Sequence, residues 1–315
     1  MTTPTSPVDG IESVAATEQA EPLAQPVVAP AEVGAPADLQ TTTITSAAPM
    51  ALEDRPDSFV YSLGQIEPRT PTLGLEKEIA QAIGRRIEDE ASSRAAFLQT
   101  IAQEENRYLA RNMCWIFNVE GIETYILVPR DPADYKLLLD TVREYPRRDD
   151  IDVVIGTRGG IAPPSMCNGI GIPIVYFEQI YSFDRETLVN SIPVPESVAA
   201  KDRKRFSDNA GGFLDHVMRM TDNAGSTDEH RALNYLAVRY PRIYAAVTEE
   251  ENRSATLSGI EVRRSSLSGV RRMVDVIFSF THRQTAVTSK SYVRVDVSEL
   301  FVFLVTPLSP YYEVP

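Results

Sequence analysis

The 315-residue chain has few of the residues that form metal sites and disulfide frameworks: two cysteines, three histidines and one tryptophan. Two cysteines exclude a disulfide-rich scaffold and a four-cysteine zinc ribbon. The longest uncharged stretch of the globular part, residues 159–177, is interrupted by prolines and glycines, which excludes a membrane-spanning helix there. The first residues lack the basic and apolar regions of a signal peptide. We therefore expect a cytoplasmic protein with reduced thiols and no membrane partner.

Basic residues are outnumbered by acidic ones, 31 to 44, and the formal net charge is −13. A chain of this charge repels nucleic acid, so we expect no nucleic-acid partner. The sequence contains no P-loop, no dinucleotide-binding GxGxxG after a strand, and no GxSxG, HExxH or CxxC motif. Neither a protease motif nor a nucleotide-binding motif is present, and this favours a protein that is not an enzyme.

The first fifty residues contain no Lys, no Arg and no aromatic residue, but ten Ala, eight Thr and seven Pro. Such a segment buries too little apolar surface to offset the entropy lost on ordering. We predict a disordered, acidic tail over residues 1–56 and one folded domain over residues 57–315.

The hydrophobic patterns of the folded part predict a mixed α+β domain. Helices are indicated before the first hairpin and again from about residue 195 to residue 247, as a helical middle layer. Ser226 to Glu229 has the pattern of a capping box, and Pro241 is expected to divide the helix that contains it. Asp-Asn-Ala-Gly occurs at 208–211 and 222–225 and predicts two helix boundaries. Strands are indicated at residues 59–66, 113–118, 123–128, 152–157, 172–177, 258–264, 272–280, 291–297 and 301–305, the last four as a mostly antiparallel C-terminal sheet.

Cys114, Cys167 and His230 are the candidate metal ligands. Two thiolates and an imidazole would bind zinc and leave a fourth position for water, with Asp228 or Glu229 as general base. The alternative is that Cys114 is a buried small hydrophobic residue and Cys167 an ordinary loop thiol. No other cofactor is indicated, and the sequence leaves both interpretations open.

The Gly/Pro-rich segment after the 152–157 strand is the best candidate for a binding loop, because ligand loops often follow buried strands. A rigid structural crossing is the alternative interpretation. The candidate binding residues are Arg158, Gly159, Gly160 and Asn168 in this segment, and Asp222, Asn223, Asp228 and Glu229 near the second Asp-Asn-Ala-Gly.

Long, irregular segments over nearly the whole folded part carry a resemblance to a known family: FVYSLGQIEPR (59–69), ENRYLARNMCW (105–115), EGIETYILVPRDPAD (120–134), DVVIGTRGGIAPPSMCNG (152–169), FEQIYSFDR (177–185), DNAGSTDEHRALNYLAVRYP (222–241), VDVIFSFTHR (274–283) and LSPYY (308–312). They resemble the C-terminal domain of unknown function of patellamide-type cyanobactin maturation proteases. The resemblance implies a setting in ribosomal peptide natural-product biosynthesis. It implies no protease activity, because the subtilisin-like domain and its serine motif are missing here.

Two hypotheses follow. The first is a non-catalytic accessory module that binds a precursor peptide or a maturation enzyme, or forms a homodimer; edge strands of the C-terminal sheet would then take up an extended peptide. The second is a metal-assisted, peptide-modifying enzyme that uses the Cys/Cys/His zinc site.

Overall fold

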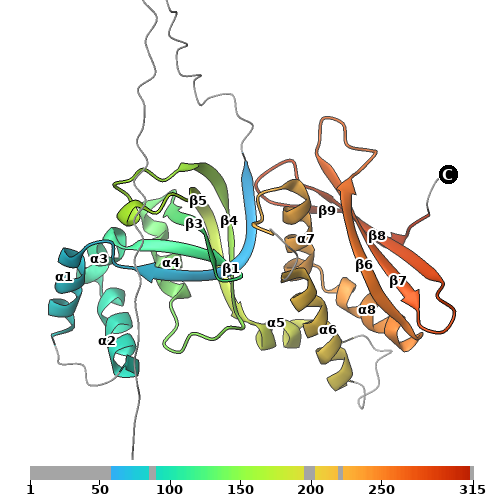
Figure 1. The fold of residues 1–315 in the computed structure, drawn as a ribbon, viewed down its shortest axis with the longest axis horizontal. Coiled ribbons are helices and arrows are strands. Elements are labelled where there is room, and N and C mark those ends of the chain that lie inside the picture. Colours follow the sequence, from blue (N-terminus) through green and yellow to red (C-terminus); the bar gives the residue numbers. More distant parts are fainter. Residues whose placement is uncertain (1–57, 85–89, 195–202, 219–222, 313–315) are drawn as a thin grey trace, which may run out of the picture. The chain divides into compact units, whose positions relative to one another are not determined.

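The computed structural model describes residues 58–84, 90–194, 203–218 and 223–312 (Figure 1). All of them belong to one unit, Leu52–Pro315. The predicted disordered tail, residues 1–56, lies outside the described residues, as does Asp222.

The first part of the described chain builds a closed barrel with strand order β1-β2-β3-β5-β4. Neighbouring strands are antiparallel, except that β3 and β5 run parallel. The strands are β1 (Phe59–Arg69), β2 (Cys114–Val119), β3 (Ile122–Pro129), β4 (Asp150–Ile161) and β5 (Pro173–Asp184). The sequence patterns predicted these strands, but not that they close into a barrel.

Helices occupy two of the barrel's connections. Between β1 and β2 lie α1 (Leu73–Ile83), α2 (Glu90–Ala102), the 3₁₀ turn η2 (Glu104–Asn106) and α3 (Arg107–Asn112). Between β3 and β4 lie the 3₁₀ turn η3 (Pro132–Asp134) and α4 (Tyr135–Thr141). A five-stranded barrel with this strand order and a helix between β3 and β4 has the connectivity of the OB fold, whose ligands bind on the β2–β3 face between the β1–β2 and β4–β5 loops.

Gly64 is the point at which β1 changes partners. Residues up to Gly64 pair with β4, and from Gln65 onward β1 pairs with β2. A Cβ atom on Gly64 would lie 2.2 Å from the backbone oxygen of Asn118. Only glycine permits this close approach, so this residue allows one strand to close the barrel.

The second part of the described chain is a helical layer followed by a sheet, as predicted. The helices are α5 (Arg185–Ser191), α6 (Arg203–Met218), α7 (Asp228–Arg239) and α8 (Arg242–Asn252). The sheet is antiparallel with strand order β6-β7-β8-β9, formed by β6 (Ala255–Arg264), β7 (Met273–His282), β8 (Thr288–Asp296) and β9 (Phe303–Pro310). The predicted α+β class, with an antiparallel C-terminal sheet, is confirmed.

Two hydrophobic cores divide the barrel's strands between them. Trp115, Phe117 and Leu127 pack inside the barrel with residues of β4, β5 and the adjacent helices. Tyr61 and Val153, on the other faces of β1 and β4, pack instead with α6, α7, α8 and the C-terminal sheet. The second of these cores therefore joins the outer faces of β1 and β4 to the C-terminal helices and sheet.

Some local predictions were wrong. The first Asp-Asn-Ala-Gly, 208–211, lies inside α6 rather than at its end. The N-cap of α7 is Thr227, whose hydroxyl accepts from the amide of His230, so the cap lies one residue after Ser226. Pro241 does separate α7 from α8, because proline starts a helix well but disfavours its interior.

Candidate functional site

Residues 162–172, which connect β4 to β5, are here called the strap. The amide of Ala162 donates to the carbonyl of Ile172 at 3.0 Å and closes the strap at its base. Within it, Met166 donates to Pro163, and Gly169 donates to Met166. The binding loop predicted from the sequence is thus shorter than expected: Arg158, Gly159 and Gly160 belong to β4, and only Asn168 lies in the strap.

The strap covers the outer face of β2 and β3. Ile116 and Ile126 pair across these two strands and point away from the barrel core, yet both are fully buried. They pack with Ala162 and Cys167, and with the half-buried Met166, Ile170 and Ile172 of the strap. The face on which OB folds bind their ligands is therefore occupied by this chain's own loop.

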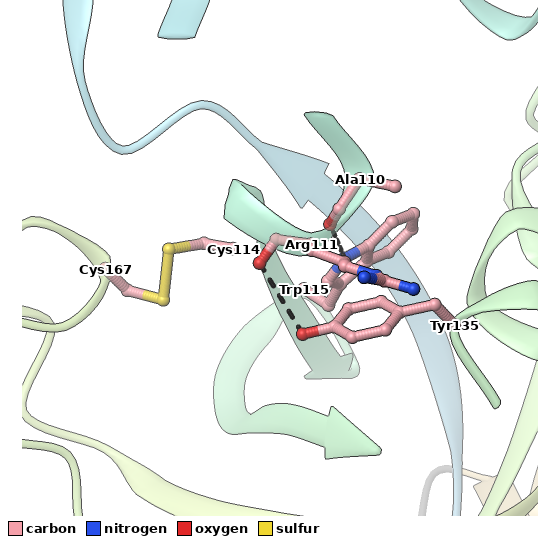
Figure 2. Close-up of a disulfide and its surroundings, with 6 residues drawn as sticks. All are labelled: Ala110, Arg111, Cys114, Trp115, Tyr135 and Cys167. Atoms are coloured by element: carbon pink, nitrogen blue, oxygen red, sulfur yellow. Dashed lines mark hydrogen bonds between the residues drawn. A yellow bond between two sulfur atoms is a disulfide. The ribbon is translucent and has the colours of Figure 1, made fainter. Parts of the chain in front are cut away.

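A disulfide fastens the strap to β2. Cys114, the first residue of β2, is bonded to Cys167 in the strap, with 5.5 Å between their Cα atoms (Figure 2). The expectation of reduced thiols was therefore wrong. So was the zinc site of Cys114, Cys167 and His230, because two sulfur atoms bonded to each other do not serve as two thiolate ligands. The zinc hypothesis had brought the two cysteines together, but it had not indicated that they bond to each other.

Within the described ranges, no group of three or more His, Cys, Asp or Glu residues is arranged to hold a metal ion. His230 lies in the first turn of α7 and is not a member of the apolar cluster that contains both cysteines.

The strap also has an unusual backbone conformation at the disulfide. Cys167, Asn168 and Gly169 have φ angles of 48°, 58° and 83°, so three successive residues are left-handed. Only glycine adopts this region without strain, and each of the other two residues costs about 1 kcal/mol.

A cavity of about 440 Å³ lies beside the disulfide and is called the strap cavity. Its walls come from the end of α3, from β2 and β3, from the start of α4, and from the strap. They include Arg111, Met113, Cys114, Trp115, Ile126, Val128, Tyr135, Cys167 and Asn168. It occupies the position between the β1–β2 and β4–β5 connections where OB folds bind ligands.

The lining of the strap cavity mixes polar and apolar groups and has a cationic side chain at its edge. Arg111 is the only charged residue among its described lining residues. No carboxylate of the described chain lies within 4.0 Å of its guanidinium. The Tyr135 hydroxyl donates to the Arg111 carbonyl at 3.5 Å (Figure 2). Burial raises the pKa of Tyr135, against the opposing effect of Arg111, so this hydroxyl stays protonated at neutral pH.

A second cavity, of about 380 Å³, lies on the other side of the strap. It brings together Arg158 and Asn223, two of the candidates from the sequence, and adds Tyr125 and Ser226. The Tyr125 hydroxyl donates to the Ala224 carbonyl at 2.9 Å. The Asn223 side-chain amide exchanges hydrogen bonds with that of Asn234 at 2.7 and 3.1 Å, so these groups are already engaged within the protein.

Asp228 and Glu229 lie in the first turn of α7, where acids favour the helix dipole. Asp228 accepts from Arg272 at 3.0 and 3.3 Å and lies 3.6 Å from Arg231. The buried Arg231 guanidinium donates to the carbonyls of Val297, Glu299 and Leu300. Asp228 thus belongs to a network that anchors the segment after β8 to α7.

A larger cavity, of about 610 Å³, was not predicted. It lies between the barrel and the helices α5 and α6, and is lined by Gln65, Asn118, Arg148, Asp150, Arg185, Asp215 and others. Arg185 and Asp215 form an ion pair across 2.8 Å, and Asp150 accepts from the amide of Arg147. Its charged groups come from distant segments, so no local pattern in the sequence could reveal it.

The C-terminal sheet presents β6 and β9 as its edges. The free side of β9 is partly closed by α7, because the Leu308 amide donates to the Tyr240 hydroxyl at 2.9 Å. Phe301, Phe303 and Val305 are nonetheless 48%, 59% and 45% exposed.

No helix of the described chain is long and apolar enough to cross a membrane.

Comparison with known proteins agrees with this architecture. Residues 200–311 match the family model described as PatG C-terminal. The resemblance to that domain is confirmed. The fold is similar to a solved structure titled "PatG Domain of Unknown Function", with a TM-score of 0.65 and 18% identity over 81% of this chain and 99% of the other. No curated protein matches the chain.

The two comparisons cover different parts of the chain. The PatG C-terminal match begins before α6 and reaches the end of β9, so it leaves out the barrel and the strap. The likeness to the solved PatG domain covers 81% of the chain and therefore includes most of the barrel. At 18% identity it shows the fold, and it carries no residue-level role to the strap cavity.

Proposed function

We propose that this chain is a non-protease accessory domain of ribosomal peptide natural-product maturation, and that it binds an acidic segment of a precursor peptide in the strap cavity. The likeness to PatG domains supports the role in peptide maturation. The choice of the strap cavity as the binding site rests on the geometry of this chain. A domain with the OB-fold connectivity also fits a binding role, although fold alone does not determine function.

The observation that carries the proposal is the charge of the strap cavity. The whole chain has a net charge of −13, yet the described lining of this cavity holds Arg111 and no acid. A carboxylate of a bound peptide would pair with Arg111. An apolar side chain beside that carboxylate would pack against Met113, Trp115 and the disulfide. The amides of Asn112 and Asn168 add hydrogen-bonding groups for a peptide backbone.

Fluorescence anisotropy tests this assignment. The probe is a fluorescein-labelled eight-residue peptide of alternating Leu and Glu, with a Leu/Lys peptide of equal length as the charge control. Arg111→Gln is expected to weaken binding of the Leu/Glu peptide about tenfold, the usual worth of a charge-assisted hydrogen bond.

The matched control variant is Arg283→Gln, which removes the charge of another exposed arginine far along the chain from the cavity-lining residues. It should leave affinity unchanged. Equal binding of the Leu/Lys peptide, or equal losses in both variants, would overturn the assignment.

A maturation enzyme is the second candidate partner, favoured by one observation. Phe303, Leu304 and Val305 of β9 are exposed, as is Phe301 just before the strand, and together they leave an apolar surface at this edge. A Phe303→Asp change that abolished enzyme binding while leaving peptide binding intact would assign that partner to the β9 edge.

A further inference from the structure

The strap separates two cavities that both border β3. The strap cavity is lined by Ile126–Val128 of this strand and by residues 164–168 of the strap. The second cavity is lined by Ile122–Tyr125 and by Gly171–Pro173. The strap therefore crosses a continuous track of β3 residues from 122 to 128.

The surface beneath the strap is apolar. Ile116 and Ile126 lie under it and are fully buried, although they belong to the outer face of the barrel. If the strap moved away, these side chains would join the two cavities into one groove. Seven residues of strand span roughly 20 Å, which suits an extended peptide of similar length.

The disulfide is the covalent link between the strap and this surface. The strap's other contacts are the buried Ala162, the half-buried Met166, Ile170 and Ile172, and the hydrogen bond at its base. Against these stand the left-handed Cys167 and Asn168, which a free chain would relax. Both cysteines line the strap cavity, so a small thiol can approach the disulfide through it.

We propose that the Cys114–Cys167 disulfide is a redox latch, and that its reduction opens a peptide groove on the outer face of β2 and β3. The reductant is a dithiol. Its thiolate attacks one sulfur and forms a mixed disulfide, and its second thiol displaces the cysteine. The dithiol loses two electrons and two protons and becomes a cyclic disulfide, while Cys114 and Cys167 become thiols.

The occupant of this groove is the acidic, apolar peptide of the proposed function, on which this inference rests. Arg111 lies at one end of the groove and Arg158 at the other, and no acid of the described residues lies within 4.0 Å of either guanidinium. The Arg158 end also holds Glu120 and Glu123, and Glu123 is paired with Arg69. In the oxidised form the strap keeps the two cavities apart, whereas in the reduced form one peptide would reach both arginines.

Hydrogen exchange with mass spectrometry on the full chain tests the latch, with dithiothreitol as the reductant. Reduction is expected to raise exchange at least tenfold in residues 162–172, while β7 serves as the internal control and stays protected. The Cys167→Ser variant should show the open pattern without reductant. Unchanged protection of the strap, or equal loss of protection in β7, would overturn the latch, the latter because the disulfide would then only stabilise the whole fold.

Anisotropy with the Leu/Glu peptide separates the two proposals. The latch predicts at least tenfold tighter binding after reduction. Equal binding in both redox states would overturn the latch and leave the proposed function standing. Absence of binding in both states would overturn the proposed function, and the exchange data would still decide whether the strap opens.

Discussion

Cys114 starts β2 and Cys167 lies in the strap, and their bond joins a barrel strand to a connection although the two cysteines are 53 residues apart in the sequence. It closes the strap over the face on which OB folds bind ligands. The same bond removes both thiols from metal binding and reshapes the site that the sequence had indicated.

Removal of this disulfide should lower the free energy of unfolding. For a loop of this length, the chain-entropy treatment gives a loss of about 4 kcal/mol. Urea unfolding of the Cys114→Ala/Cys167→Ala double variant, compared with the oxidised chain, measures the loss. The reduced chain is the control and should agree with the double variant. A difference below about 1 kcal/mol would mean that the disulfide does not constrain the unfolded chain.

Gly64→Ala should destabilise the barrel strongly. The new methyl group would meet the Asn118 backbone oxygen and the Phe117 ring within 3 Å, so β1 must shift, at a cost of about 3 kcal/mol or more. Gly160→Ala is the matched control, because a Cβ atom there meets nothing within 4 Å. Thermal unfolding of both variants measures this, and equal midpoints would contradict the close approach described for β1.

Arg231→Met should also destabilise the fold, by about 3 kcal/mol or more, because three carbonyl oxygens between Val297 and Leu300 lose their donor. Burial lowers the pKa of Arg231 to about 10, which leaves its guanidinium charged at neutral pH. Arg239→Met, which changes an exposed arginine of the same helix, is the control. Urea unfolding that ranks the two variants equally would show that the network is not stabilising.

Stability should fall when the pH rises above about 10. Burial and the neighbouring Tyr181 raise the pKa of Tyr61, and burial raises the pKa of Tyr244. These tyrosines stay protonated in the folded chain but ionise at about pH 10 when it unfolds. Their stabilising contribution is therefore complete below pH 10 and is lost as the pH rises beyond it.

The measurement is the urea midpoint at pH 9 and pH 11. The loss should be smaller in Tyr61→Phe than in the exposed control Tyr312→Phe. Equal losses in the two variants would contradict the role assigned to the buried hydroxyl.

Much of the fold was predictable because local patterns determine it. Alternating and β-branched segments such as 152–157 predicted the strands, and Pro241 predicted the break between α7 and α8. The closure of the barrel was not predictable, because it depends on a close approach between Gly64 and Asn118, which are 54 residues apart. A glycine in a strand does not indicate which distant residue will approach it.

The site was predicted in part. Asn168 and both cysteines do line the strap cavity, and Arg158 and Asn223 meet in the second one. The chemistry at the cysteines was wrong, because spacing along the chain does not distinguish two metal ligands from a disulfide pair. The sequence analysis did not identify Arg111. In the sequence, an exposed arginine at the end of a short helix cannot be distinguished from other solvated charges, because only the fold places the strap beside it.

An NMR titration of the ¹⁵N-labelled full chain with the Leu/Glu peptide tests most directly whether the strap cavity binds peptide. Binding there should shift the amides of Arg111–Trp115, Ile126–Val128 and Ser165–Asn168. Shifts confined to β6 or β9, or no shifts at saturating peptide, would contradict it.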